Sequence, residues 1–258
     1  MLALLALMAT PTYAGPADHN TTLTVLASPQ TSRDSVMAGL RIDMSDGWKT
    51  YWRAPGDAGI PPLIQWVGST NVGSIAFHWP VPDVFDQDGM RSIGYYGTVT
   101  IPVEIFPNDV GDIRLSGSIN IGVCEEICIP VNLEFDTLLP LDAPRDAAIT
   151  AALMNRPLTA SEASVGAVTC TIAPTSGGMQ ITTRTALSQQ DPEEIIIEIS
   201  DPYVWVSEPD VTRTATHITA TSDLIHVDGT SFAVDRSGIR ITVLGQNRAV
   251  DIQGCTAS

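Results

Sequence analysis

Gly122-Val123-Cys124-Glu125-Glu126-Ile127-Cys128-Ile129-Pro130 holds two of the chain's four cysteines, with three residues between them. A straight strand rises about 3.3 Å per residue, so these positions would lie about 13 Å apart, whereas disulfide-bonded Cα atoms lie within roughly 7 Å. If the two cysteines are bonded, the segment must fold back, and we predict a hairpin with Glu125, Glu126 and Ile127 at its tip. A disulfide that closes so short a loop stabilises a fold little, which makes this one a candidate for redox chemistry.

The runs around this hairpin predict the fold class. Short segments rich in Val, Ile and Thr alternate with turns drawn from 18 prolines and 20 glycines, a pattern typical of an all-β protein. About eight such segments fall within residues 15–143, which fits an immunoglobulin-like β-sandwich. Residues 144–162 start with a proline and continue into an Ala-rich run, so we predict a short helical linker. Residues 163–258 are again strand-rich and predict a second, smaller β-sandwich.

The N-terminus and the charge limit the classes of function. Residues 1–14 are an apolar run too short to span a bilayer, ending in small residues that suit signal-peptide cleavage after Ala14. We therefore expect an exported protein that works outside the cytoplasm, where disulfides form. The net charge of −16, without any cluster of Lys or Arg, disfavours binding to nucleic acid. No later segment is long and apolar enough to predict a membrane span of its own.

The other two cysteines are expected to form a structural disulfide. Cys170 lies in the first predicted strand of the second sandwich, and Cys255 follows its last strand. The first and last strands of a sandwich often lie close, and a bridge between them would contribute about 4–5 kcal/mol in the chain-entropy model. Four cysteines allow three pairings, of which we favour Cys124–Cys128 with Cys170–Cys255.

Other chemistries have weaker support. The histidines are scattered and show no metal-ligand spacing, although a close cysteine pair with His78 or Met90 could hold Cu(I). The signatures of serine hydrolases and zinc proteases are absent. The aromatic residues Trp48, Tyr51 and Trp52 are interpreted as sandwich core rather than as a ligand surface.

The residues between the cysteines bear on the direction of electron transfer. Glu125 and Glu126 place two negative charges beside any thiolate, which raises the thiol pKa. Strongly oxidising dithiols do the reverse and stabilise a low-pKa thiolate. We therefore expect a reducing pair tuned by these two glutamates, unless Arg53 or Arg91 lies close enough to offset them.

Several motifs, in order, resemble one known family. They are Gly47-Trp48-Lys49-Thr50-Tyr51-Trp52, Pro55-Gly56-Asp57-Ala58-Gly59-Ile60-Pro61-Pro62, Trp79-Pro80, Ile101-Pro102-Val103 and the cysteine hairpin through Pro130. Together they are similar to the N-terminal periplasmic domain of the thiol:disulfide interchange protein DsbD and of its relatives in the ScsB copper-sensitivity group. The resemblance covers roughly residues 20–140, and residues 163–258 match more loosely. The cysteine spacing here is tighter than is usual in that family.

The resemblance implies a mechanism and its residues. The pair would accept electrons from a membrane-embedded donor and pass them to periplasmic thioredoxin-like partners. Cys128 would attack the partner disulfide and Cys124 would resolve the mixed disulfide. A cap loop over the pair is implied near residues 86–92, with Met90 or Phe85 as the cover and these candidate residues: Phe85, Asp86, Asp88, Gly89 and Met90.

Two hypotheses follow from the sequence. The first is a periplasmic thiol–disulfide exchange protein, acting as a protein-disulfide reductase component with no cofactor beyond its redox-active disulfide and no metal. Since no membrane domain accompanies it here, we expect a separate membrane protein as the donor. The alternative is a periplasmic binding or copper-tolerance module, in which the pair binds Cu(I) or is only structural.

Overall fold

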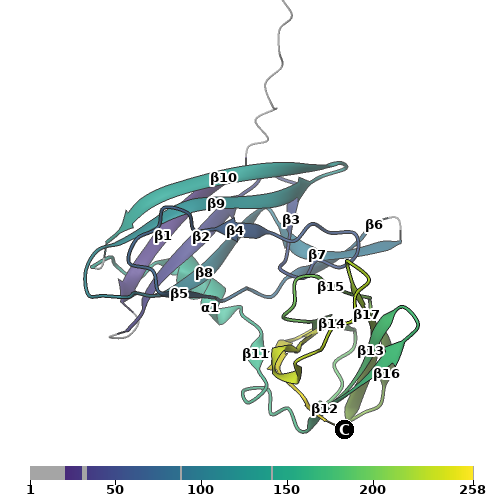
Figure 1. The fold of residues 1–258 in the computed structure, drawn as a ribbon. Helices are drawn as coiled ribbons and strands as arrows, with labels where there is room; N and C mark the ends of the chain where they lie inside the picture. The colour runs from purple at the N-terminus through teal and green to yellow at the C-terminus, as the bar shows by residue number, and fades with distance from the viewer. Residues whose placement is uncertain (1–20, 31–33, 88, 141, 258) are drawn as a thin grey trace, which may run out of the picture.

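The computed structural model describes residues 21–30, 34–87, 89–140 and 142–257, which form two β-sandwiches lying side by side (Figure 1). The expected signal peptide at residues 1–14 lies outside these ranges. Within them, α1 (Ala147–Met154) is the single α-helix, accompanied by strands and by a short 3₁₀ turn at Arg236–Gly238. The all-β, immunoglobulin-like class expected from the sequence is confirmed.

The first sandwich packs a four-stranded antiparallel sheet on a larger one. The smaller sheet has the order β1 (Thr22–Gln30), β2 (Val36–Asp43), β8 (Thr98–Phe106) and β5 (Ser74–Phe77). The larger sheet has the order β10 (Cys128–Leu139), β9 (Ile113–Cys124), β3 (Lys49–Tyr51), β7 (Met90–Tyr96) and β6 (Asp83–Gln87), with β4 (Leu63–Gln65) also paired to β9. Branched aliphatic side chains such as Leu40, Ile105 and Leu115 fill the space between them.

Strand β2 is buried on both faces because α1 covers the outer face of the smaller sheet. Ile149 of α1 is fully buried there, and a Cβ on Gly39 would lie only 2.7 Å from its Cγ1 atom. The helix begins at Asp146, whose carboxylate accepts hydrogen bonds from the backbone N–H groups of Ala148 and Ile149. The segment expected as a linker thus contains a helix that packs on the first sandwich.

The second sandwich repeats the two-layer plan with shorter strands. One sheet has the order β11 (Leu158–Thr159), β19 (Ala249–Gln253), β18 (Arg240–Gly245) and β14 (Glu193–Glu198). The other has the order β15 (Val204–Val206), β17 (His217–His226), β13 (Gly178–Ala186), β12 (Val168–Thr175) and β20 (Thr256–Ala257), with β16 (Asp210–Arg213) also on β17. Strand β11 comes from within residues 144–162, the range that we assigned to the linker.

The two sandwiches meet along β14 and its neighbours. Ile195 and Ile197 point into the core of the second sandwich, whereas Ile196 packs with the core cluster of the first. This alternation is what a strand with a period of two presents to two different apolar layers. The contact between the sandwiches therefore includes buried apolar surface, which favours one fixed arrangement over a flexible linkage.

Candidate active site

The cysteine hairpin projects from one end of the larger sheet, where β9 and β10 meet (Figure 1). Cys124 and Cys128 face each other as cross-strand partners, their Cα atoms 4.1 Å apart, and are joined by a disulfide. The tip between them is exposed, and Ile127 is 75% accessible. The predicted hairpin, with its three-residue tip, is therefore what the structure contains.

The two cysteines differ in exposure. Cys124 is fully buried, because β9 lies between β10 and β3 and pairs with both. Cys128 is exposed, because it begins β10, the edge strand of the sheet. An incoming thiolate can therefore reach Cys128 far more readily than Cys124.

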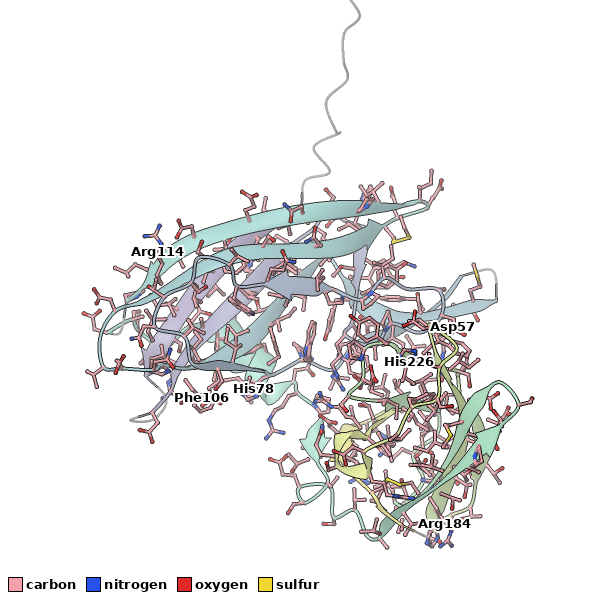
Figure 2. All side chains as sticks on the ribbon, in the orientation of Figure 1. Asp57, His78, Phe106, Arg114, Arg184 and His226 are labelled. Atoms are coloured by element: carbon pink, nitrogen blue, oxygen red, sulfur yellow. A yellow bond between two sulfur atoms is a disulfide. The ribbon has the colours of Figure 1, made fainter. Side chains whose placement is uncertain are left out.

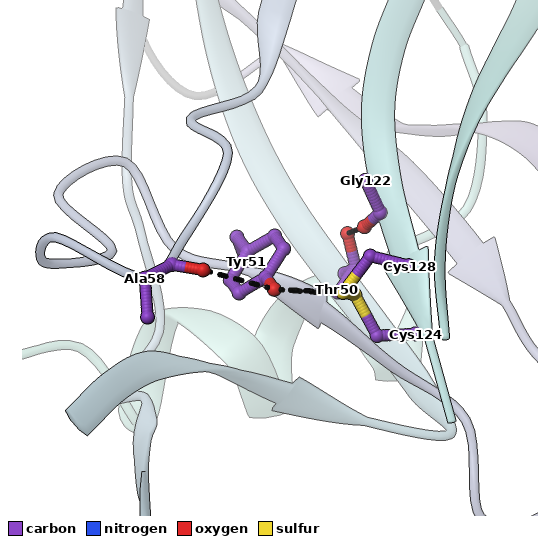
Figure 3. The surroundings of a disulfide bond; sticks show 6 residues. All are labelled: Thr50, Tyr51, Ala58, Gly122, Cys124 and Cys128. Atoms are coloured by element: carbon purple, nitrogen blue, oxygen red, sulfur yellow. Dashed lines mark hydrogen bonds between the residues drawn. A yellow bond between two sulfur atoms is a disulfide. The ribbon is translucent and has the colours of Figure 1, made fainter. Parts of the chain in front are cut away.

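The hydroxyl of Tyr51 lies against the disulfide (Figure 3). Its oxygen is 3.2 Å from the sulfur of Cys124 and 3.2 Å from that of Cys128. Since disulfide sulfurs carry no hydrogen, the tyrosine O–H is the donor in this group, and it also reaches the carbonyl of Ala58 at 3.4 Å. Burial raises the pKa of Tyr51, so the hydroxyl keeps its proton at neutral pH.

Gly122 leaves room for this tyrosine. A Cβ at this position would lie 3.0 Å from Cε2 of Tyr51 and 3.2 Å from Ile60. The adjacent strand is held by Thr50, whose hydroxyl donates to the carbonyl of Gly122 at 2.9 Å (Figure 3). The missing side chain at Gly122 therefore leaves space for the Tyr51 ring against β9, beside the cysteines.

Lys49 brings a positive charge to the same face. It is the cross-strand partner of Cys124, and directly opposed residues of an antiparallel pair share a face. Its side chain is buried, with the ammonium 4.8 Å from the ring centroid of Phe85, and burial lowers its pKa. Lys49 also lines a small pocket together with Glu125.

The face that carries Cys124 holds Lys49 as well as the acidic tip residues Glu125 and Glu126, whose negative charges were the basis of the expected reducing character. Both glutamates lie at the exposed tip. We considered Arg53 and Arg91 as cations that could offset the negative charges of the two glutamates. Both instead form ion pairs with the second sandwich, Arg53 with Glu198 and Arg91 with Glu194. Lys49, directly opposite Cys124 on β3, supplies a positive charge on this face, and a positive charge there favours the thiolate.

The segment expected as a cap loop is mostly a hairpin. Phe85 and Asp86 belong to β6 and Met90 to β7, and Gly89 makes the turn with a positive φ of 77°. The Asp86 carboxylate accepts a hydrogen bond from the Gly89 N–H at 3.1 Å.

The side chains of this hairpin differ in burial. Phe85 is buried edge-on against Tyr96, with ring centroids 4.6 Å apart, whereas Met90 is 59% exposed. Asp88 lies outside the described residues. The contact to the sulfurs comes from Tyr51, and the contacts of Phe85 are with Tyr96 and Lys49.

The second disulfide joins Cys170 to Cys255, 85 residues apart in the chain. Cys170 is fully buried in the core of the second sandwich, on β12, and the chain after Cys255 pairs with this strand as β20. Figure 2 shows both disulfides as yellow bonds, one in each sandwich. The four cysteines are paired as the sequence favoured.

Among the described residues, no group of three or more His, Cys, Asp or Glu side chains is placed to hold a metal ion. Within the same ranges, the structure has no helix of the length and apolar character needed to cross a membrane.

The positions of two residues beside the cysteine pair, Tyr51 and Lys49, are not predicted from the sequence. Tyr51 was assigned to the sandwich core, because an aromatic residue on a short strand is more often packed than functional. Lys49 was not singled out, although it is the only lysine in the chain. Their alternation on β3 puts both on one face, but only the pairing of β3 with β9 places that face beside Cys124.

Comparisons with known proteins agree with this geometry. The sequence model of the family "Thiol:disulfide interchange protein DsbD, N-terminal" matches residues 22–140. The fold is similar to the crystal structure of the N-terminal periplasmic domain of ScsB from Proteus mirabilis, with a TM-score of 0.67 and 24% identity, over 97% of each chain. That likeness covers both sandwiches and, at this identity, shows the fold alone. None of the curated proteins matches the chain.

Proposed function

We propose that this chain exchanges disulfides with partner proteins through Cys124 and Cys128, because residues 22–140 match the sequence model of the DsbD N-terminal family. The observation that carries the proposal is the asymmetry of the pair. One sulfur is exposed on an edge strand, and the other is buried directly opposite it. An attacking cysteine needs access to a partner, whereas a resolving cysteine needs access only to its neighbour.

Electrons leave the reduced protein in two steps. The Cys128 thiolate attacks one sulfur of a partner disulfide, forming a mixed disulfide and releasing the partner's other sulfur as a thiolate. The Cys124 thiolate then attacks the Cys128 sulfur, which re-forms the Cys124–Cys128 disulfide and releases the partner's second thiolate. Two electrons have passed to the partner, which has become a dithiol.

Electrons enter by the reverse sequence. A dithiol donor attacks the exposed Cys128 sulfur, and Cys124 leaves as a thiolate. The donor's second thiolate then resolves the mixed disulfide, leaving the donor oxidised and this pair reduced. We propose a membrane-embedded protein as the donor, thioredoxin-like proteins as the acceptors and the periplasm as the compartment. The family match and the ScsB-like fold support this choice.

Two side chains stabilise the thiolates that form in these steps. The Tyr51 hydroxyl is 3.2 Å from both sulfurs and can donate to whichever becomes a thiolate. The buried ammonium of Lys49 lies on the same face as Cys124 and favours its departure as an anion. The chemistry needs no metal or organic cofactor, since the disulfide itself carries the electrons.

The test is the reduction potential of the Cys124–Cys128 pair in the exported protein. The protein is equilibrated in glutathione or dithiothreitol buffers and then alkylated. Working exchange proteins lie roughly between −270 and −120 mV, whereas structural disulfides typically lie below about −300 mV. We expect a value inside the working range, with Cys170–Cys255 still oxidised. A pair that stays oxidised until the fold unravels would overturn the proposal and leave a structural bridge.

A trapping experiment separates exchange from copper binding. The variant Cys124→Ser should accumulate a mixed disulfide with thioredoxin-like proteins through Cys128, because the resolving thiol is gone. The matched variant Cys128→Ser should trap far less, since its remaining thiol is buried. Tight Cu(I) binding that needs both thiols, together with no trapping by either variant, would favour the copper-tolerance module instead.

A further inference from the structure

One segment of the first sandwich, residues 53–61, contacts both the second sandwich and Tyr51 beside the disulfide. A cleft of about 490 Å³ lies at the junction between the sandwiches, lined on one side by residues 53–61 and on the other by β14 and the segment around β15. Residues 53–61 leave β3 directly after Tyr51 and Trp52. We call this segment the junction loop, and Asp57, labelled in Figure 2, lies where it meets the second sandwich.

On its inner side the junction loop holds Tyr51. The carbonyl of Ala58 accepts the tyrosine hydroxyl at 3.4 Å (Figure 3). Ile60 packs at the position where Gly122 lacks a side chain, next to the same ring. The loop is anchored to its own sandwich by the carbonyl of Pro55, which accepts the N–H of Ile93 at 3.0 Å.

On its outer side the loop is held by the second sandwich. The indole N–H of Trp205 donates to the Asp57 carboxylate at 3.1 Å. At the start of the loop, the Arg53 guanidinium binds both carboxylate oxygens of Glu198, at 3.0 and 2.9 Å. Trp205 itself is placed by β15, where it pairs with Ile225 of β17.

These contacts form a chain from the second sandwich to the sulfurs. Trp205 binds Asp57, the next residue Ala58 binds the Tyr51 hydroxyl, and that hydroxyl lies 3.2 Å from the Cys128 sulfur. We propose that Trp205 is a positioning residue for the redox pair, through which the second sandwich holds the Tyr51 hydroxyl where it donates to the Cys128 thiolate. This inference rests on the proposed function of the pair.

The direction of the effect follows from the hydrogen bond to the thiolate. A donor held at the sulfur stabilises the anion and lowers the thiol pKa. The single hydroxyl hydrogen of Tyr51 cannot serve the Ala58 carbonyl and the thiolate fully at once, so the loop acts by holding the tyrosine ring in place, with Ile60 beside it. Without the Trp205 contact, the loop and the Tyr51 ring sample more positions, and the hydrogen bond to the thiolate is made for less of the time. The ionisable side chains that line the pocket beside the hairpin are Lys49 of β3, Asp86 of β6, Tyr96 of β7 and Glu125 of the tip, and Glu126 is the next residue of the tip. Substitution of Trp205 leaves all of these in place.

The experiment measures the pKa of the Cys128 thiol in the Cys124→Ser background. There Cys128 is the single free thiol, because Cys170 and Cys255 are bonded to each other, and no reductant is needed. The rate of iodoacetamide alkylation is followed against pH to give the thiol pKa. Trp205→Phe keeps an aromatic ring and removes the N–H group that donates to Asp57. We expect it to lower the thiolate fraction of Cys128 at pH 7 by about two- to fivefold. Tyr203→Phe is the matched control, because it removes a hydroxyl close to Trp205 in the sequence that is not part of the Trp205–Asp57–Ala58–Tyr51 contacts. It should leave the Cys128 thiol pKa unchanged.

A double variant tests the route through Tyr51. With Tyr51→Phe already present, Trp205→Phe should have no further effect, because the hydroxyl that it positions is gone. An unchanged pKa in Trp205→Phe, or effects of the two substitutions that simply add, would overturn the proposal. The Cys128 thiol pKa is measured without any partner protein, so the two proposals can fail separately. If Trp205→Phe shifts this pKa as expected but Cys124→Ser traps no partner, the exchange function is refuted and the positioning role of Trp205 stands.

Discussion

The hydroxyl oxygen of Tyr51 lies 3.2 Å from the sulfur of Cys128, although the two residues are 77 positions apart. The contact exists because β3 pairs with β9, which in turn pairs with β10. It gives the exposed sulfur of the pair a donor that stays protonated at neutral pH, since burial raises the pKa of Tyr51. The hairpin disulfide therefore has a hydrogen-bond donor next to its sulfurs, which can stabilise a thiolate when the bond is reduced.

Removal of the Tyr51 hydroxyl should make the Cys128 thiol less acidic. A hydrogen bond to a charged group contributes about 1.5–3 kcal/mol, so Tyr51→Phe should raise the thiol pKa by about one unit or more. The measurement is the pH dependence of alkylation in the Cys124→Ser background. Tyr96→Phe, which alters an exposed tyrosine on the neighbouring strand β7, is the control. Equal thiol pKa values in the two variants would contradict the role of Tyr51.

Removal of the Lys49 charge should act mainly on Cys124. Lys49→Met keeps a long apolar side chain over Phe85 but removes the cation beside the buried sulfur. The thiol pKa of Cys124 should then rise by about one unit, because an opposite charge that favoured the thiolate is gone.

The measurement for Lys49 is the ultraviolet absorbance of the thiolate against pH in the Cys128→Ser background. Arg41→Met, which removes a surface cation paired with Asp43 on the other sheet, should leave the titration of Cys124 unchanged. A titration of Cys124 that Lys49→Met does not shift would exclude an electrostatic role for this lysine.

The packing of α1 on the first sandwich is tested at Gly39. An alanine Cβ there would lie 2.7 Å from Cγ1 of Ile149 and 3.2 Å from Cγ2 of Thr100, so either the helix or the strand must shift. Gly39→Ala should lower the free energy of unfolding by about 1–3 kcal/mol, measured by urea denaturation. Gly177→Ala introduces a Cβ with nothing within 4 Å and should have little effect. If Gly39→Ala were as stable as the control, α1 would not pack where the structure places it.

Acid should weaken the ion pair between Arg156, which follows α1, and Glu162, which follows β11. Arg156 and Thr159 hold the Glu162 carboxylate and lower its pKa from about 4.5 to about 2. A pKa that is lower in the folded state stabilises the fold fully above the unfolded value, and this stabilisation disappears as pH falls through the folded one. Glu162→Gln should therefore lower Tm at pH 7, and the difference from the parent protein should shrink between pH 4.5 and pH 2.

The measurement for Glu162 is thermal unfolding of both proteins at several pH values across this range. Glu134→Gln, an exposed substitution on β10, serves as the control. A Tm difference that stays constant down to pH 2 would show that the carboxylate does not titrate as stated.

The local features of this protein follow from nearest neighbours in the sequence. Alternating Val, Ile and Thr runs between Pro and Gly residues predict strands, and the fold class derived from them is confirmed. The three-residue spacing of Cys124 and Cys128 requires a hairpin once the two are bonded, because a straight strand would hold them too far apart. These inferences succeed because each depends on constraints that act within a few residues.

The environment of the cysteines was not predicted, because it depends on which strands pair. The glutamates at the tip suggested an acidic setting, whereas the pairing of β3 with β9 brings the Tyr51 hydroxyl to the sulfurs and places Lys49 opposite Cys124. Likewise, nothing near Trp205 in the sequence points to Asp57, 148 residues earlier.

The sequence by itself therefore determined the strand content, the hairpin and the cysteine pair that is bonded across it, since local geometry and residue chemistry decide these. Only the tertiary structure decided which sulfur is exposed, which cation and which hydroxyl lie beside it, and how the second sandwich reaches it. The physical reason is that burial and electrostatics are properties of neighbours in space. In an all-β protein most of those neighbours come from distant parts of the chain.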